Sequence, residues 1–195
     1  MTSRFKHPSH EIESLKSKAL KAALTILATH GVQELKLRAI AETAGIGIAS
    51  MYHYFDGKDD LLLNLAIRGF EDLRADILRC QSDPEYVSPM RGGARAFFTF
   101  AQGQPALFSL MFDEGLMARH AALREAEHNT FLAYEASVLA DDQIPKQYQE
   151  VAAFALWALG RGMAAILSSY PGAQPPEDVF LKLFAGASYL INHPD

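Results

Sequence analysis

The chain has 195 residues, of which 49% are hydrophobic, 21% charged and 10% aromatic, and its net charge is −5. This composition indicates a globular protein with one large domain or two small ones. Continuous apolar runs are shorter than the ~18 residues of a membrane-spanning helix, the first residues lack the apolar core of a secretory signal, and a single cysteine excludes an internal disulfide. We therefore expect a cytoplasmic protein with no membrane partner.

Charge is distributed unevenly along the chain. Residues 1–58 hold 8 lysines and arginines against 5 aspartates and glutamates, whereas residues 59–195 hold 10 against 18. A basic part followed by an acidic part suggests that only the first part faces an anion. A small excess of lysines is also common on a solvated surface, so that charge alone leaves the partner open.

Apolar residues recur at helical spacing throughout, and no segment alternates as a half-buried strand does. The first helix carries an apolar stripe from Leu15 to Leu27 and is stopped by Gly31, since glycine commonly ends helices. A short helix follows over 37–44 and ends at Gly45, and a second short helix covers 48–55. A long helix, capped by Asp56 or Gly57, then runs to about residue 78.

The segment 81–89 has two prolines and no periodicity, which indicates a linker. Beyond it, the spacing predicts helices near 90–102, 105–112, 117–139, 147–169 and 177–192. The fold class is therefore all-α: a three-helix head followed by a larger helical body.

The stretch RAIAETAGIGIASMYHYF, from Arg38 to Phe55, has the pattern of a helix-turn-helix. Small Ala41 and Ala44 would let the two short helices approach, Gly45 would turn the chain, and Ile46 would fill the space between them. In this motif the second helix enters the major groove of DNA. An ordinary helical hairpin would give the same short pattern, so the flanking helices and the basic charge are needed to favour DNA binding.

The longer stretch LRAIAETAGIGIASMYHYFDGKDDLL resembles the N-terminal signature of TetR-type transcriptional regulators, and YHYF followed by GKDDLL is its most specific part. The resemblance is close over residues 16–65 and loose beyond them. It implies a DNA-binding domain over 1–58, whose tail 1–10 we expect to be disordered, and a ligand-binding and dimerisation domain over 59–195. It also implies a homodimer that binds a double-stranded DNA operator and needs no cofactor.

The resemblance further implies roles for single residues. The first residues of the second short helix would face base edges. Two aromatic residues of that helix would donate hydrogen bonds to phosphates, and a lysine at the start of the long helix would contact a phosphate. An arginine would lie beside the groove. Phe55 would be core, and Tyr54 would pack rather than contact DNA. The predicted DNA-binding residues are Arg38, Gly47, Ile48, Ala49, Ser50, Tyr52, His53 and Lys58.

The sequence departs from the family pattern at three helix starts. Lys36, Gly47 and Gly57 stand where the family commonly has serine, threonine or asparagine. Ile48 and Ala49 offer base edges only apolar contact, which suits thymine methyl groups. We therefore predict that phosphate and shape contacts carry much of the affinity. In the tail, Arg4 and Lys6 could form a minor-groove arm, although a disordered tail is the stronger expectation.

The body is dense in phenylalanine and methionine. These side chains could simply form a core, but such linings also suit an adaptable apolar cavity. Arg161 stands where related bodies have a His-Gly motif; it could contact an anionic ligand or pair with Glu125 or Glu127. The predicted ligand-binding residues are Phe97, Phe100, Phe108, Met111, Phe112, Phe131, Trp157, Arg161 and Met163.

Small residues line the helices near 147–169 and 177–192, and the resemblance makes these the dimer interface. The predicted function is that of a ligand-responsive transcriptional regulator: a repressor that a small apolar or amphipathic effector releases from a near-palindromic operator. A helical interaction protein that has lost specific DNA binding is the alternative.

An enzyme is not expected. His120 and His128 lie eight residues apart without a third metal ligand at helical spacing, and neither a phosphate-binding glycine loop nor a nucleophile elbow is present. The other polar residues of this region that could serve chemistry are Asp113, Glu114, Arg124 and Glu127.

Overall fold

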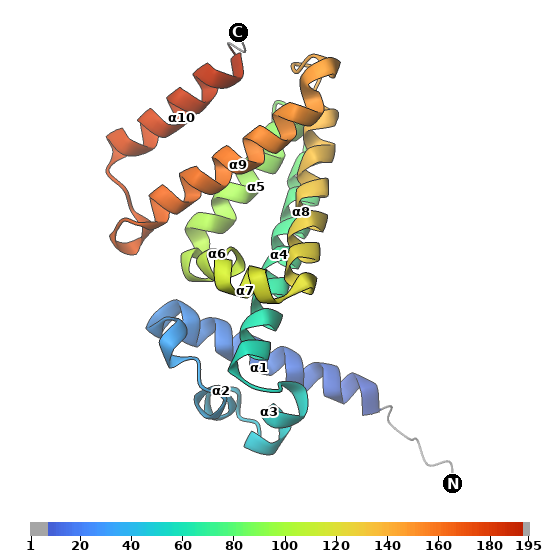
Figure 1. Cartoon of the computed structure of the whole chain (residues 1–195), viewed down its shortest axis with the longest axis vertical. Coiled ribbons are helices and arrows are strands. Elements are labelled where there is room, and N and C mark those ends of the chain that lie inside the picture. The colour runs from blue at the N-terminus through green and yellow to red at the C-terminus, as the bar shows by residue number, and fades with distance from the viewer. Residues whose placement is uncertain (1–7, 193–195) are drawn as a thin grey trace.

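The protein is described here by a computed structural model covering residues 8–192, apart from the side chains of residues 8–14, 173, 180, 184 and 187–192. Within this range all regular structure is helical, as the sequence predicted (Figure 1). The elements are α1 (Pro8–His30), η1 (Val32–Glu34), α2 (Leu37–Ala44), α3 (Ile48–Tyr54), α4 (Lys58–Gln81), α5 (Pro89–Gly103), α6 (Pro105–Met111), α7 (Glu114–Arg119), α8 (Ala121–Leu139), η2 (Lys146–Tyr148), α9 (Gln149–Ser168), η3 (Pro171–Ala173) and α10 (Glu177–Asn192).

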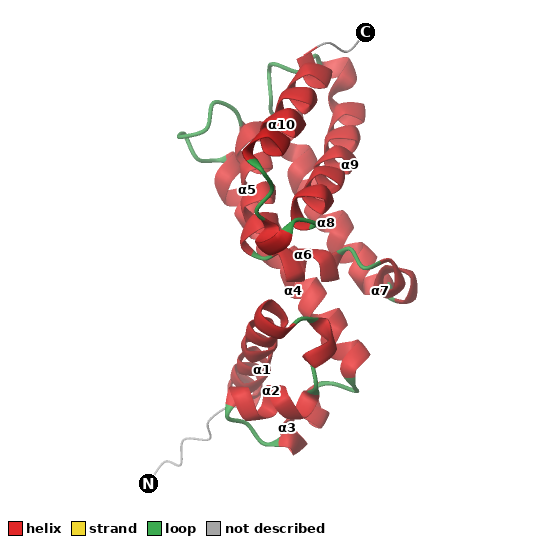
Figure 2. Cartoon of the chain, turned by 90° about the vertical axis from the view of Figure 1, so that its left-hand side faces the viewer, coloured by secondary structure: helices red, strands yellow, loops and turns green. Residues whose placement is uncertain are grey.

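Helices α1 to α3 form a head at one end of the molecule, and the remaining helices form the body (Figures 1 and 2). Helix α4 leaves the head and runs into the body, where it packs against α5, α6 and α8. Helices α6 and α7 lie at the end of the body that faces the head, with α1 packed on α6. The body therefore meets the head through α4 and through the α6–α7 segment.

The head is held together by apolar side chains from each of its helices. Ile40 of α2, Met51 of α3 and Phe55 are fully buried, and the Lys16 ammonium of α1 lies 5.9 Å from the centre of the Phe55 ring. Gly45 has the left-handed conformation (φ 64°, ψ 36°) that the predicted turn requires. This packing fixes α3 with one face against α1 and the other face toward solvent.

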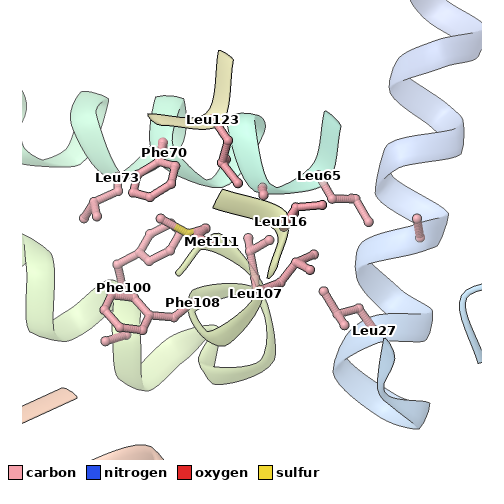
Figure 3. Close-up of a cluster of buried hydrophobic side chains, with 14 of the residues drawn as sticks. Leu27, Leu65, Phe70, Leu73, Phe100, Leu107, Phe108, Met111, Leu116 and Leu123 are labelled. Carbon is pink, nitrogen blue, oxygen red and sulfur yellow. The ribbon is translucent and has the colours of Figure 1, made fainter. Parts of the chain in front are cut away.

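The apolar core runs without a break from the head into the body. Figure 3 shows Leu27 of α1 close to Leu107 of α6, with Leu65 of α4 and Leu116 of α7 beside them. Farther into the body, α4 and α5 cross so closely that a Cβ at Gly92 would lie 2.2 Å from the Cys80 carbonyl oxygen. Helix α4 begins at Lys58, the last residue of the predicted DNA-binding domain, and the head and the body share one core.

The helix predicted near 117–139 is wrong in its first part. Two helices, α7 and α8, meet there at His120, whose extended backbone (φ −122°, ψ 107°) interrupts the helical path. Neither glycine nor proline marks this break. The continuous helical spacing of apolar residues therefore predicted one helix where the structure has two. The break turns the His120 side chain toward the head, where it contacts Asp59.

The N-cap residues of the three α-helices that follow α1 are those that the sequence predicted. Lys36, Gly47 and Gly57 are the N-cap residues of α2, α3 and α4, and none of them makes a side-chain cap hydrogen bond. Ser88 caps α5, since its Oγ accepts a hydrogen bond from the Arg91 amide. Residues 8–10 of the tail expected to be disordered belong to α1, whereas Arg4 and Lys6 lie outside the described residues.

One described helix is long and apolar enough to cross a membrane. It covers Lys146–Ser168. Its most apolar 18 residues have a mean hydropathy of 1.6, and 33% of them are buried. The sequence reading missed this because Glu150 and Arg161 interrupt the apolar run. The core helix of a soluble protein passes the same test of length and composition.

Candidate nucleic-acid interface and ligand cavity

The outer face of α3 is uncharged and open to solvent. Tyr52 is 65% exposed and Ile48 is 42% exposed, and Ala49 and His53 are exposed as well. On the opposite face Met51 is fully buried. Residues of α3 that were predicted to contact DNA therefore lie on one accessible face, with Ser50 half-buried at its side.

Two exposed cationic side chains belong to the helices before and after α3. Arg38 of α2 contacts Glu42 (Nε to Oε1, 3.4 Å), and their side chains are 86% and 72% exposed. The Lys58 ammonium at the start of α4 donates to the Gln33 carbonyl oxygen at 3.4 Å. Such exposed contacts contribute little to stability. Both cations can therefore turn to a phosphate at small cost.

The turn before α3 leaves room for a larger residue at Gly47. Its backbone is extended (φ −67°, ψ 142°), and a Cβ placed there would meet no atom within 4 Å. Glycine is thus not required by the fold at this position. The resemblance leads one to expect a polar side chain at the start of α3. Packing does not exclude such a side chain at this position.

A cavity of about 810 Å³ lies between α6 and α9 in the body. This volume falls in the range of sites for drug-sized molecules. Of the predicted ligand-binding residues, Phe108, Phe112 and Arg161 line it. The lining residues that the sequence analysis missed are small or hydroxylated: Pro105, Ala106, Ser109, Ala158, Gly162, Ala165, Ser168 and Ser169.

The other predicted ligand-binding residues lie away from this cavity. Phe97 and Trp157, whose rings pack edge to face at 5.2 Å, border a separate void of about 20 Å³, and Phe131 packs on Trp157 at 5.8 Å. This void is too small for an effector. The buried side chains of Phe100, Met111 and Met163 line neither space.

Arg161 pairs with Glu127, one of the two carboxylates that the sequence offered, and also lines the cavity. Its Nη1 donates to Glu127 Oε1 at 3.0 Å, and its guanidinium carbon lies 4.3 Å from the centre of the Phe112 ring. The ring and the carboxylate together hold a positive charge at the cavity wall. Arginine has five N–H donors, so that this contact leaves donors for a molecule in the cavity.

A second group of charged residues joins the first turn of α4, where this helix leaves the head, to α7 and α8 of the body. Asp59, in the first turn of α4, accepts from Arg119 Nη2 at 2.7 Å and contacts His120 Nε2 at 2.6 Å. The hydrogen bonds from Arg119 and then His120 lower the pKa of Asp59. Sequence analysis missed this group because its members lie 60 residues apart and carry no motif.

Three of the polar residues that could have served catalysis make contacts that support the fold. Asp113 caps α7 by accepting from the Leu116 amide at 2.7 Å, Arg124 donates to the carbonyl oxygens of Met117 and Ala118, and Glu127 pairs with Arg161. In the part of the chain that the structure describes, no three His, Cys, Asp or Glu side chains gather as a metal site would require.

Residues 19–65 match the family model of bacterial regulatory proteins of the tetR family. The match covers α2, the turn, α3 and the first turns of α4, where the geometry above is that of a helix-turn-helix. Residues 19–65 therefore form a TetR-family DNA-binding head. The members of this family and the relatives below are regulatory proteins rather than enzymes.

The HTH-type transcriptional regulator Rv1816 of Mycobacterium tuberculosis is 28% identical to this chain over 112 residues. The match covers 56% of this chain and 48% of Rv1816, so that the chain spans about half the length of the curated relatives it matches.

Solved structures share the fold over nearly the whole chain. The regulatory protein SCO4313 superposes with a TM-score of 0.74 at 20% identity, covering 96% of this chain and all of that one. The transcriptional regulator FadR of Bacillus subtilis, solved with stearoyl-CoA, gives a TM-score of 0.66 at 15% identity over 90% of this chain and 97% of FadR. At these identities the likeness concerns the fold alone.

Proposed function

We propose that this protein is a ligand-responsive, DNA-binding transcriptional regulator of the TetR family. The observation that carries the proposal is the outer face of α3, which exposes Tyr52, His53, Ile48 and Ala49 without a charge while Met51 anchors the helix from behind. A solvated helix face usually carries charged residues. An exposed aromatic and uncharged face within a helix-turn-helix fits a helix that packs into the major groove.

In this proposal the first residues of α3 contact base edges and the surrounding residues contact phosphates. Ile48 and Ala49 offer apolar contact to thymine methyl groups, whereas the Tyr52 hydroxyl and a His53 N–H donate to phosphate oxygens. Lys58 and Arg38 exchange their weak protein contacts for phosphates. Gly47 offers no side-chain donor, so that phosphate and shape contacts supply most of the affinity.

The chain acts as a homodimer, because a single short helix reads too few base pairs for specific binding. Helix α9 carries an exposed stripe that suits a subunit interface: Val151, Ala155, Ala158, Gly162, Ala165, Ile166 and Ser169. These residues recur at helical spacing opposite the buried face of α9. The stripe also accounts for the membrane-like hydropathy of this helix, so that the protein works in the cytoplasm without a membrane.

The effector is a small apolar or amphipathic molecule that binds in the cavity between α6 and α9. Phe108 and Phe112 provide apolar contact, and Arg161 provides hydrogen-bond donors for one polar group. The FadR structure with stearoyl-CoA shows that a protein of this fold accommodates a ligand with a long apolar chain. Ala158, Gly162 and Ala165 belong both to the cavity wall and to the exposed stripe of α9. A bound effector would therefore act on the spacing of the two subunits.

The regulator is a repressor, and the effector releases it from a near-palindromic operator. Release requires that the effector bind more tightly to a dimer whose two α3 helices no longer match successive major grooves. To shift the population from 1:99 to 99:1, the difference in affinity between the two states must be about 10⁴-fold. A cavity in contact with both α6 and the subunit interface is placed to provide such a difference.

The test is a selection of bound duplexes from genomic fragments, including the DNA that flanks the gene of this protein. Recovery of one near-palindromic sequence, followed by release of that DNA in a compound screen, supports the proposal. Compounds that stabilise the protein without releasing DNA would contradict the effector mechanism. If no duplex is selected at low salt, the chain is instead a helical interaction protein without specific DNA binding.

A further inference from the structure

The contacts of Asp59 with Arg119 and His120 join the first turn of α4 to the junction between α7 and α8. One Asp59 oxygen accepts from Arg119 Nη2 at 2.7 Å, and the other lies 2.6 Å from His120 Nε2. Two donors on two different oxygens fix the direction of the carboxylate as well as its position. We call these three residues the latch.

One side of the latch belongs to the DNA-binding surface. Asp59 follows Lys58 directly and lies four residues after Phe55, which is fully buried in the head. The Asp56 amide donates to Asp60 Oδ2 at 3.1 Å, so that the turn between α3 and α4 is tied to the same first turn of α4. A change in the direction of this turn therefore moves α3 relative to the body.

The other side of the latch is anchored in the body. Arg124 of α8 donates to the carbonyl oxygens of Met117 and Ala118, which fastens the end of α7 to α8. Leu116 and Leu123, on either side of the latch residues, are buried, and Figure 3 shows both pointing into the apolar core. Arg119 and His120 are thus supported by a fixed part of the body.

The latch is also close in sequence to the cavity. Phe112 lines the cavity, and Arg119 is the last residue of the short helix α7, whose N-cap, Asp113, directly follows Phe112. The head and the body otherwise meet through apolar side chains such as Leu27 and Leu107 (Figure 3). Apolar contact resists separation of the head from the body but is non-directional. The Asp59 carboxylate, although half-exposed, is held in direction by two donors.

We propose that Asp59, Arg119 and His120 are positioning residues that hold the head in the orientation that binds DNA. The inference rests on the proposed function as a DNA-binding regulator. None of the three residues needs to touch DNA: they act through the direction of α4.

The diagnostic variant is Asp59→Asn, because two explanations of the latch predict opposite changes in its affinity for DNA. If Arg119 and His120 merely neutralise a carboxylate beside the DNA-binding face, removing that charge should raise the affinity for DNA. If the latch positions the head, the same variant should lower the affinity, by about 5-fold or more. Affinity is measured by fluorescence anisotropy with the duplex selected by the wild-type protein.

A charge exchange provides the rescue. Asp59→Arg alone should bind DNA weakly, because two arginines then face each other, and the double variant Asp59→Arg with Arg119→Asp should regain affinity. A purely electrostatic effect predicts the reverse order, since the single variant carries more positive charge. Asp76→Asn is the matched control: it removes an exposed carboxylate that pairs with Arg79 at 2.8 Å within α4, and it should leave DNA affinity unchanged.

A second measurement needs no DNA. Spin labels on Thr43→Cys in α2 and Glu125→Cys in α8, with Cys80→Ser in the background, report the distance between head and body by pulsed electron resonance. The proposal predicts a narrow distance distribution for the intact latch and a broader one for Asp59→Asn. Unchanged distributions together with undiminished DNA affinity would overturn the latch. Failure of the wild-type protein to bind DNA would instead overturn the proposed function.

Discussion

Gly69 of α4 faces the thioether of Met111 on α6, with no space for a methyl group between them. A Cβ at Gly69 would lie 2.6 Å from Met111 Sδ and 3.2 Å from Leu107 Cγ. The missing side chain allows α6 to pack directly on α4. The first turn of α4 contains Asp59 of the latch. Since the other face of α6 borders the cavity, this contact sets the distance between the cavity and the helix that leaves the head.

Gly69→Ala should destabilise the protein by about 1–2 kcal/mol, because overpacking against the buried Met111 side chain outweighs the roughly 0.5–1 kcal/mol that alanine gains over glycine within a helix. Chemical denaturation of the pure protein measures the change. Gly103→Ala, at the end of α5 where a Cβ meets no atom within 4 Å, is the control and should stay within about 0.5 kcal/mol. Equal stability of both variants would show that α6 does not rest on Gly69.

Tyr52→Phe should weaken DNA binding by about 10-fold or more, since the lost hydroxyl donates to a charged phosphate oxygen. The melting temperature should not change, because Tyr52 is 65% exposed. Tyr54→Phe is the matched control: Tyr54 is half-buried and packs against the rings of His53 and Phe55, so that its hydroxyl should not matter for DNA. Anisotropy titrations with the selected duplex provide both affinities, and equal losses would contradict the assignment.

Gly47→Ser should strengthen DNA binding several-fold. The backbone at this position is already extended, and the new side chain meets no neighbour within 4 Å. Its hydroxyl can cap α3, which adds a few tenths of a kcal/mol to stability, and it can donate to a phosphate. A variant that binds the selected duplex no better than the wild type would mean that the start of α3 lies away from the DNA backbone.

Glu127→Gln should raise the affinity of the cavity for an anionic amphiphile such as dodecanoate, and Arg161→Gln should lower it. The first change frees the Arg161 guanidinium from its carboxylate partner at 3.0 Å, and the second removes the positive charge. Thermal stabilisation by increasing dodecanoate measures both affinities, because a ligand of the folded state raises stability by mass action. The same order of affinities for decanol would show that charge is not the cause.

The latch should contribute to stability above the ordinary pKa of an aspartate and lose this contribution in acid. Hydrogen bonds from Arg119 and His120 lower the pKa of Asp59 in the folded state, so that the folded chain releases this proton more readily than the unfolded chain. The difference in stability between wild type and Asp59→Asn should therefore shrink as the pH falls below about 4, where the unfolded aspartate begins to bind its proton. A difference that does not depend on pH would contradict these hydrogen bonds.

Much of the head could be predicted from local sequence. Gly45 ends α2 because few other residues adopt its left-handed backbone, and the spacing of Met51 and Phe55 places both on one buried face of α3. The missing caps at Lys36, Gly47 and Gly57 were also visible, since an N-cap is defined by its own side chain. The contacts of this face with DNA remain predictions.

The body was less predictable because its site depends on tertiary contacts. Phe108 and Phe112 line the cavity, whereas Phe97, Phe100 and Trp157, also predicted as ligand contacts, lie away from it. An aromatic residue fills a core as readily as it lines a cavity. The cavity wall consists largely of alanine, glycine and serine, which lack a recognisable pattern in sequence. The break at His120 and its contact with Asp59 arise from a packing between segments 61 residues apart, which no local pattern reveals.

The most direct test of the central claim, that the α3 face binds operator DNA, is the salt dependence of binding to the selected duplex. For the wild-type protein the logarithm of the association constant should fall linearly with the logarithm of salt concentration, because phosphate contacts release counterions. Lys58→Ala should reduce the slope by about one for each subunit. Binding that is insensitive to salt, or an unchanged slope in Lys58→Ala, would contradict the account.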